Sequence, residues 1–381
     1  KRVLNLISGS EEIDRLPIYL TINGLQPKNV EETSTSIVST AVPKNENLVK
    51  LRSELKKRGD LVYLTEFPEF DRRFLLIPKR NISLEEDRQE EYLLKKYRVK
   101  TPEGDLSYRE KVEVGVDTTW VEEPLLKNRK DAERILLVSG DFDRDTLDKS
   151  IKQYKKRVGE QDEWVKYIWV STPLVCASHM LPMDKFLMWA QSEKELLHRI
   201  IKTAYRRIRR RLEYLLEHDL GDIYRFGGSE QATPPMMSPE LYDEFVREYD
   251  EKLFDLVHDY GKLVQVHVHG KVRTVLKKMN EMGVDATDPL EPPPQGDITP
   301  KEALEVTDKQ MTLVGNIEFK DLEREAPQVI KRRTKDLIRQ TEGKKLIVAS
   351  SANPISGISD ALLKNYLAML EATEESEFYQ R

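Results

Sequence analysis

The chain has 381 residues and 39% hydrophobic content, which is enough for one large α/β barrel or two ordinary domains with a sizeable core. Its formal charge of −5, with acidic and basic residues interleaved, argues against a nucleic-acid-binding surface. A single cysteine, Cys176, excludes an intrachain disulfide and fits a reducing, cytoplasmic location. No apolar run approaches the ~20 residues of a membrane span, so we expect no membrane contact.

Eight short apolar runs follow one another along the chain, separated by helical patterns, as alternating parallel β/α units require. They are residues 18–22, 61–64, 167–170, 222–226, 263–269, 286–290, 312–315 and 346–349. Eight is the strand number of a (β/α)8 TIM barrel. We therefore predict this α/β fold, with residues 1–381 as a single domain.

One segment departs from the alternation. Residues 92–100 and 106–114 are two strand-like stretches joined by the turn sequence Pro102-Glu-Gly-Asp105. We therefore predict an antiparallel hairpin, inserted in the barrel over residues 90–125.

Two later segments carry helical signals. Ser238 and Pro239 predict the start, and Gly261 the end, of a helix over residues 240–260. The basic run 206–211 lies in a helical pattern dense in carboxylates, so we expect it on a solvated outer face.

His267 and His269 end the apolar strand in Lys262-Leu-Val-Gln-Val-His-Val-His-Gly270, and the alternation sends both imidazoles to the same side of the chain. This is a metal-ligand spacing, at the point where α/β folds carry their chemistry. Hydrogen bonding inside a polar barrel mouth is the alternative role of the pair.

Other polar residues end predicted strands. Asp288 and Glu291 end the sixth one, so we expect at least one of them to point into the mouth, as a catalytic acid or as a structural partner of His269 or Lys271. Asn316 is placed to orient a substrate or to satisfy backbone groups.

Several ordered motifs resemble those of the uroporphyrinogen decarboxylase-like superfamily over nearly the whole chain. They are residues 117–124, 236–245, 266–272, 281–294 and 313–317. The resemblance implies a (β/α)8 barrel with one of two activities, porphyrinogen decarboxylation or zinc- or corrinoid-dependent methyl transfer.

The decarboxylase branch implies an arginine-rich loop after the first strand, an acidic residue after the second, then a tyrosine, and a histidine after the last strand. Here Thr21-Ile-Asn23 has no arginine, Glu66 takes the acidic position, and His179 stands where tyrosine would fall. A substrate with eight carboxylates needs cationic partners, so the missing arginines disfavour this activity.

The methyltransferase branch implies zinc on a His-x-Cys pair and a later cysteine. His267 fits, His269 replaces the thiolate, and the later position near Ser351 has lost its sulfur. Glu230, which ends the preceding strand, can complete a site of two imidazoles and a carboxylate with a fourth position open. These harder ligands make zinc more Lewis-acidic and suit it to polarising an oxygen.

We therefore predict an enzyme, a metal-assisted methyltransferase that moves a methyl group from a small methylated donor to a corrinoid. The donor can be a methoxylated aromatic, which makes the reaction an O-demethylation, and the acceptor a corrinoid protein or free cobalamin. A carboxy-lyase and a catalytically silent small-molecule-binding barrel are the alternatives, and the family allows a homodimer. The expected catalytic residues are Asp288, Glu291 and Glu66, the substrate-binding residues Asn23, His179, Asn316 and Ser351, and the metal ligands His267, His269 and Glu230.

Overall fold

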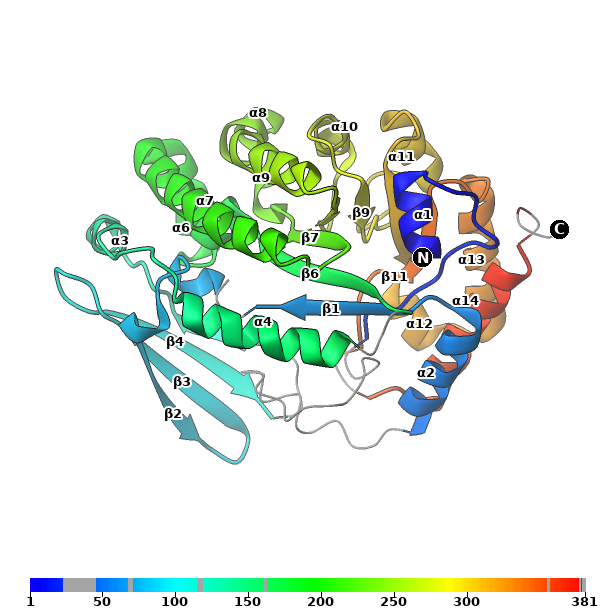
Figure 1. Ribbon diagram of the computed structural model, residues 1–381, viewed down its shortest axis with the longest axis horizontal. Coiled ribbons are helices and arrows are strands. Elements are labelled where there is room, and N and C mark those ends of the chain that lie inside the picture. The colour runs from blue at the N-terminus through cyan, green and yellow to red at the C-terminus, as the bar shows by residue number, and fades with distance from the viewer. Residues whose placement is uncertain are drawn as a thin grey trace.

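The structure, a computed structural model, describes residues 1–22, 46–67, 71–114, 119–159, 163–354, 357–376 and 378. Its centre is a curled, parallel seven-stranded sheet with the order β1-β6-β7-β8-β9-β10-β11, and helices pack against its outer face (Figure 1). The strands are β1 (Val62–Glu66), β6 (Val165–Ser171), β7 (Ile223–Gly227), β8 (Leu263–His267), β9 (Ala286–Asp288), β10 (Thr312–Ile317) and β11 (Leu346–Ser350).

Seven of the eight predicted strands are therefore present, and the fold is TIM-barrel-like. The first predicted strand, residues 18–22, is instead one parallel bridge between Ile18 and Val348 of β11. The amide of Tyr19 donates to the carbonyl of Val348 (3.2 Å), and the amide of Asp60 donates to that of Ile18 (2.8 Å). The segment thus links β11 to the start of β1.

Helices alternate with the strands as predicted. They are α1 (Arg2–Ser8), α2 (Glu46–Arg58), α3 (Arg129–Leu136), α4 (Arg144–Val158), α5 (Pro173–Ser178), α6 (Met183–Ser192), α7 (Lys194–Glu217), α8 (Pro239–Tyr242), α9 (Glu248–Asp259), α10 (Arg273–Glu281), α11 (Pro300–Val306), α12 (Phe319–Arg324), α13 (Pro327–Gln340) and α14 (Asp360–Glu374). Short 3-10 turns are η3 (Arg72–Phe74), η4 (Lys79–Asn81) and η5 (Glu230–Ala232). None of the helices in these ranges combines the length and apolarity that crossing a membrane requires.

The helix predicted over residues 240–260 is present as α8, a π-helical turn η6 (Asp243–Arg247) and α9. The hydroxyl of Ser238 caps it by accepting the amide of Leu241 at 3.4 Å. Gly261 ends it in the left-handed conformation, at φ 68°.

The solvated face expected for the basic run 206–211 is wrong for two arginines of α7. Arg207 and Arg211 are buried, with 6% and 2% of their surface exposed. Their guanidinium groups donate to the carbonyls of Leu75 and Leu76, each at 2.6 Å. Buried carbonyls need donors, and this need is not visible in the charge pattern of the helix.

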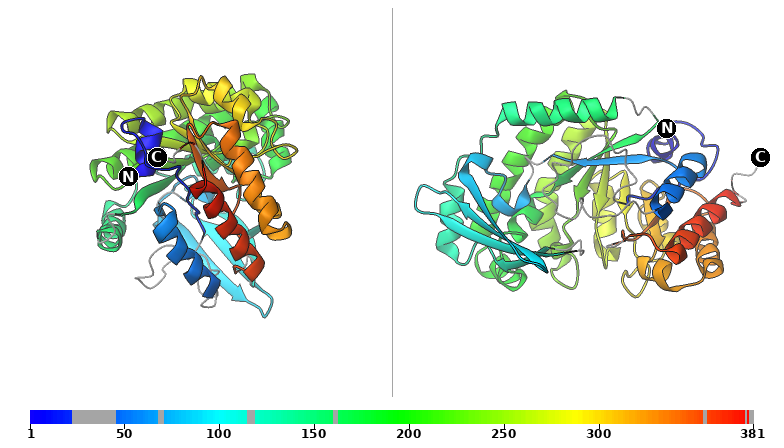
Figure 2. Two further views of the ribbon diagram at one scale, coloured as in Figure 1. Left: turned by 90° about the vertical axis from the view of Figure 1, so that its right-hand side faces the viewer. Right: turned by 90° about the horizontal axis from the view of Figure 1, so that it is seen from below.

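The predicted hairpin is present as β3 (Tyr92–Val99) and β4 (Leu106–Glu113), but it is the middle of a larger sheet. β2 (Ile82–Arg88) and β5 (Thr119–Glu123) flank it in an antiparallel sheet with the order β2-β3-β4-β5. This sheet lies at the end of the molecule toward which β1 points, away from both termini (Figures 1 and 2).

Alternation along the parallel strands decides which side chains face the inside of the curled sheet. Tyr167, Ile223, Val314 and Ile347 pack together there. Residues an even number of positions further along each strand point the same way. The inward positions at the carboxyl ends are therefore Glu66, Trp169, Arg225, His267, Asp288 and Asn316.

Candidate functional site

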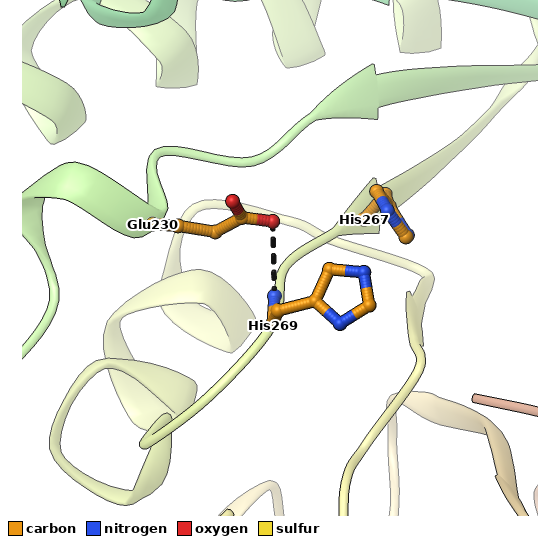
Figure 3. A group of neighbouring side chains, drawn as sticks. All are labelled: Glu230, His267 and His269. Atoms are coloured by element: carbon orange, nitrogen blue, oxygen red, sulfur yellow. Dashed lines mark hydrogen bonds between the residues drawn. The ribbon is translucent and has the colours of Figure 1, made fainter. Parts of the chain in front are cut away.

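Glu230, His267 and His269 meet at the carboxyl ends of β7 and β8 (Figure 3). One ligand atom from each residue lies within 4.8 Å of those of the other two. Gly228 allows the loop after β7 to approach β8, because a Cβ atom there would lie 2.2 Å from the carbonyl oxygen of His267. The sequence prediction thus selected three residues that the fold brings together.

The His267 imidazole is held through Nδ1, which lies 2.8 Å from Oδ2 of Asp288. Arg225 Nη2 is equally close to Nδ1. A guanidinium can only donate, whereas the Asp288 carboxylate can only accept. If Nδ1 carries the proton, it therefore donates to Asp288 and forms no hydrogen bond with Arg225. Burial, with the charge of Arg225, lowers the pKa of His267. A neutral His267 that donates from Nδ1 presents the lone pair of Nε2 to the mouth.

Asp288 is ionised despite its burial. Burial would raise its pKa, but the charge of Arg225 and the hydrogen bonds from His267 and Arg225 hold the pKa well below its usual range. Arg225 Nε lies 3.1 Å from Asp288 Oδ1. Gln265 Nε2 donates to the same oxygen at 2.6 Å, so the carboxylate is fully engaged.

His269 repeats this arrangement with Glu291. Its Nδ1 lies 3.0 Å from Glu291 Oε1, while the amide of Gly270 donates to Oε2 at 2.6 Å. Burial alone would lower the pKa of His269, but the bond to Glu291 and nearby carboxylates raise it overall. Burial alone would raise the pKa of Glu291, but the hydrogen bonds from His269 and Gly270 lower it overall.

Both histidines therefore have Nδ1 fixed by a carboxylate and no hydrogen bond at Nε2 from the described residues, which is typical of metal-binding imidazoles. The carboxylate of Glu230 adds an oxygen ligand, and its Oε1 accepts the backbone amide of His269 at 3.2 Å. Two nitrogens and one oxygen are a donor set that zinc accepts. The three residues fit a metal ion.

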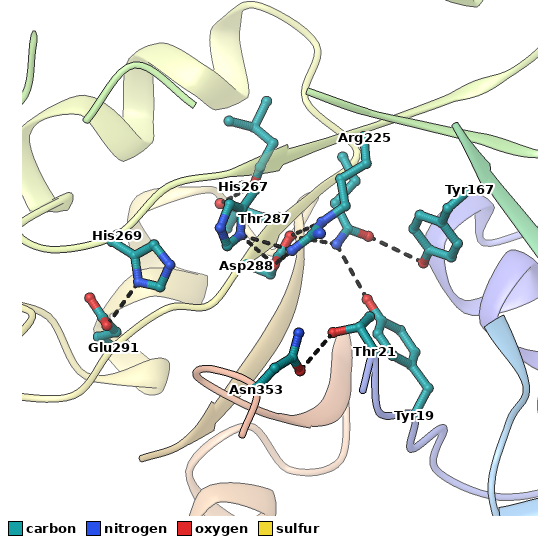
Figure 4. Close-up of polar contacts among 12 residues, drawn as sticks. Tyr19, Thr21, Tyr167, Arg225, His267, His269, Thr287, Asp288, Glu291 and Asn353 are labelled. Carbon is teal, nitrogen blue, oxygen red and sulfur yellow. Dashed lines mark hydrogen bonds and ion pairs between the residues drawn. The ribbon is translucent and has the colours of Figure 1, made fainter. Parts of the chain in front are cut away.

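A polar network supports the site from inside the curled sheet (Figure 4). The side-chain amide of Gln265 joins Asp288 to two tyrosines. The Tyr167 hydroxyl donates to Gln265 Oε1 at 3.2 Å, and Gln265 Nε2 donates to the Tyr19 hydroxyl at 3.3 Å. Arg225 lies 5.1 Å from the ring centre of Trp169. The same ring meets the His267 imidazole edge-on at 5.6 Å, so Trp169 forms an aromatic wall beside the possible metal position.

Glu66 is the last residue of β1 and His179 follows α5, and neither shares a hydrogen bond with the three possible ligands in the described part of the chain. Glu66 is exposed to solvent, yet desolvation by the surrounding protein raises its pKa. Burial, followed by the charges of Arg72 and Arg73, lowers the pKa of His179 to about 4. Arg72 donates to Nδ1 of this neutral imidazole at 3.4 Å.

The other predicted substrate residues have different positions. Asn316 is buried on β10 at an inward position. Ser351 has a structural contact, because its hydroxyl oxygen accepts the amide of Phe319 at 3.1 Å. Asn23 lies outside the described residues, and nearby Thr21 donates to Asn353 at 3.2 Å (Figure 4).

Sequence reasoning missed Arg225, Trp169 and Glu318. Glu318 directly follows β10, and its pKa is raised by burial and by the charge of Glu291. The signal was present in the alternation, because Val314, Asn316 and Glu318 are spaced by two. The prediction ended this strand at residue 315 and so stopped short of Glu318.

Imidazole, carboxylate and amide groups at the carboxyl ends of a TIM-barrel-like parallel sheet define the class of barrel enzymes that carry their chemistry at this edge. The chain belongs to the uroporphyrinogen decarboxylase (URO-D) family, whose sequence profile matches residues 112–375. The family predicted from the motifs is thereby confirmed.

Solved structures show similarity at low sequence identity. A methyltransferase from Methanosarcina mazei is 16% identical, with a TM-score of 0.61, over 98% of this chain and 97% of that one. A B12-independent methionine synthase from Shewanella sp. W3-18-1, in complex with selenomethionine, is 13% identical with a TM-score of 0.38, over 87% and 89% of the two chains. The first match shows the shared fold. No curated protein sequence matches the chain at a significant level.

Proposed function

We propose that the protein is a methyltransferase that moves an oxygen-bound methyl group from a small donor, such as a methoxylated aromatic compound, to a corrinoid. The acceptor is a corrinoid protein or free cobalamin. The observation that carries the proposal is the pair of carboxylate-anchored imidazoles beside Glu230. Membership of the family and the fold shared with the Methanosarcina mazei methyltransferase support it.

His267, His269 and Glu230 would hold a zinc ion, which when bound supplies a Lewis acid that polarises the donor oxygen. Asp288 and Glu291 act through the histidines, because they fix the two Nδ1 atoms. With Nδ1 of each ring bonded to a carboxylate, Nε2 is the nitrogen that each histidine would offer to the metal ion.

The rest of the mouth would bind the donor. Trp169 offers an aromatic wall beside His267, which suits a ring-bearing methyl ether. Glu66 at the end of β1 and neutral His179 after α5 supply polar groups, and we place them in the substrate cleft. We place Asn316 and Ser351 there as well, and Asn23, which lies outside the described residues, is proposed as a substrate-binding residue from the sequence alone.

Two arginines near the mouth are already paired with carboxylates, which weakens the case for decarboxylation of a substrate with many carboxylates. Arg73 already pairs with Asp71 at 2.7 Å and with Glu110 at 2.9 Å. Arg225 pairs with Asp288 inside the curled sheet. A guanidinium that is already paired with a carboxylate in the protein gains little from a further carboxylate of the substrate.

We further propose that the whole chain acts as one domain, in which residues 18–22 occupy the eighth strand position of a closed barrel. The backbone bonds at Ile18 support this arrangement. The single cysteine, Cys176, suits a reducing cytoplasm. A homodimer is compatible with this proposal.

Metal analysis tests the proposal. Protein purified without a metal-affinity tag is compared with His267→Ala and His269→Ala, and with the control His218→Ala, whose ring bonds the carbonyl of Tyr214 on α7. We expect about one zinc per chain in the wild type and in the control, and loss of zinc in both site variants. Absence of metal from the folded wild type would contradict the zinc site.

Methyl transfer is then measured with cob(I)alamin as acceptor and methoxybenzene as donor, in parallel with porphyrinogen turnover. Methylated cobalamin that forms with the wild type and not with His267→Ala supports the proposal. Carbon dioxide release from porphyrinogen without methyl transfer would replace it with decarboxylation, and neither product would indicate a binding protein.

A further inference from the structure

Glu318 occupies the side of the mouth that faces the possible metal ligands across β9. Gln265, Ala286 and Thr312 lie side by side on β8, β9 and β10. Four residues further along each chain segment, His269 and Asn316 therefore lie at similar levels along the strand direction. Glu318 is two residues beyond Asn316 and points to the same, inward side. Two interstrand spacings separate β8 from β10, roughly 10 Å, which leaves room for a small molecule between them.

The carboxyl group of Glu318 makes few contacts that would stabilise the fold. It is 9% exposed, and its Oε1 is a buried atom without a hydrogen-bond partner among the described residues. Glu318 occupies the position before α12 but makes no side-chain cap to that helix. Ser351 is its one hydrogen-bond partner in the described part of the chain. A buried polar atom without a partner calls for an explanation, and for an atom beside the mouth a catalytic role is one such explanation.

The surroundings of Glu318 favour its protonated form. Burial raises its pKa, and the nearby carboxylate of Glu291 raises it further. Lys320, Ser351 and His269 act in the opposite direction but leave the pKa raised overall. Glu291 itself remains charged through its bonds to His269 and Gly270. The mouth thus combines a carboxyl group whose pKa is lowered with one whose pKa is raised, which is a usual way to supply an acid.

We propose that Glu318 donates the proton that the donor oxygen takes up when its methyl group leaves. This inference rests on the proposed methyl transfer. The bond between the methyl carbon and the oxygen breaks, and the methyl group passes to a reduced corrinoid, which supplies the electron pair of the new bond. The oxygen keeps the pair of the broken bond and takes the proton of Glu318, so an alcohol or phenol leaves and Glu318 becomes a carboxylate.

Leaving-group dependence tests this role. The variants are Glu318→Gln, which keeps the size of the side chain without the acidic proton, and the control Glu323→Gln on the exposed face of α12. Each is assayed with cob(I)alamin and with methoxybenzene or 4-nitromethoxybenzene, whose phenoxide is stable without a proton. We expect Glu318→Gln to lose about 10²-fold in rate with methoxybenzene and much less with the nitro compound. Equal losses with both donors would overturn the proposal.

A second measurement does not depend on turnover. Infrared difference spectra of the wild type against Glu318→Gln should contain the carbonyl band of a protonated carboxyl group at neutral pH, and the band should shift when phenol binds. The spectrum of Glu323→Gln should retain it. Absence of the band, or a band indifferent to phenol, would overturn the acid role. A wild type that keeps this response but methylates no cobalamin would contradict the proposed reaction and leave Glu318 facing the bound oxygen.

Discussion

Buried carboxylates differ in this molecule according to what each one faces. Asp288 receives bonds from Arg225, Gln265 and His267, so it remains ionised and orients an imidazole. Glu318 has one hydrogen-bond partner among the described residues, and its pKa is raised. Asp250 of α9 is 3% exposed, and its Oδ1 has no hydrogen-bond partner among the described residues. The same functional group is thus a structural anchor, a candidate acid and a source of instability in three places.

Replacement of Asp250 should stabilise the protein near neutral pH. Burial raises the pKa of Asp250 well above its ordinary value of 3.8, so the folded state holds a proton that the unfolded chain has released. The free energy of unfolding therefore falls as pH rises from about pH 4 to the folded pKa. Asp250→Asn cannot ionise, and we expect it to gain about 1–3 kcal/mol at pH 7.

Urea unfolding of the wild type and Asp250→Asn between pH 4 and pH 8 measures this effect. The difference between the two proteins should grow with pH over that range. A variant that is less stable than the wild type, or a constant difference, would show that Asp250 has a stabilising partner.

At the scale of elements, strand alternation predicted much of the site and the composition of loops predicted little. His267, His269 and Asp288 are inward residues of apolar runs that the sequence makes visible. Arg225 also lies in such a run, but it was not among the residues predicted from the sequence. Its burial depends on the partner Asp288, which is 63 residues away in the sequence. Such long-range pairing is set by the fold and not by local pattern.

The strands β2 and β5 escaped prediction for another reason. The sequence of β2, Ile82-Ser-Leu-Glu-Glu-Asp-Arg88, has only two apolar residues and is mostly exposed, so it lacks the sustained alternation of a half-buried strand. It is ordered by backbone pairing to β3 along its length. An edge strand of this kind depends on its neighbour more than on its own side chains.

The antiparallel sheet is joined to the central fold by a buried ion pair, which gives a second prediction. Arg73, which follows β1, donates to both carboxylate oxygens of Glu110 on β4 at 2.9 Å, and Tyr97 of β3 donates to the same group. Glu110→Ala should cost about 3 kcal/mol, because it leaves part of a buried guanidinium unpaired. The loss should act mainly on this sheet.

Hydrogen exchange distinguishes a local loss from a global one. In Glu110→Ala, the amides of β3 and β4 should exchange faster under native conditions, while those of β8 and β9 keep their protection. The control Glu113→Ala removes a carboxylate from the exposed side of β4, where 45% of the side chain is exposed, and should change neither region. Equal acceleration in all strands would contradict a local role for Glu110.

For the whole molecule, the N-terminal segment joins the first and last strands of the curled sheet. Arg2 of α1 pairs with Asp60, just before β1, and Asp60 Oδ2 accepts the amide of Ile18 at 3.1 Å. Ile18 in turn bridges to Val348 of β11. Residues far apart in the sequence therefore meet in one seam, and the geometry of the carboxyl ends depends on that seam as well as on the strands themselves.

Asp60 and Asp14 allow the seam to be tested, because both bind Arg2 and only one is buried. The Asp60 side chain is 9% exposed and that of Asp14 is 73% exposed. Asp60→Ala leaves the amide of Ile18 without its acceptor and should cost about 1–3 kcal/mol, whereas Asp14→Ala should cost less than about 1 kcal/mol. The midpoint of urea unfolding measures both. If the seam closes the sheet, Asp60→Ala should also speed exchange at the amides of Tyr19 and Val348, which hydrogen-bond across it. Equal costs for the two variants, with unchanged exchange at these amides, would mean that the parallel strands hold together without the N-terminal segment.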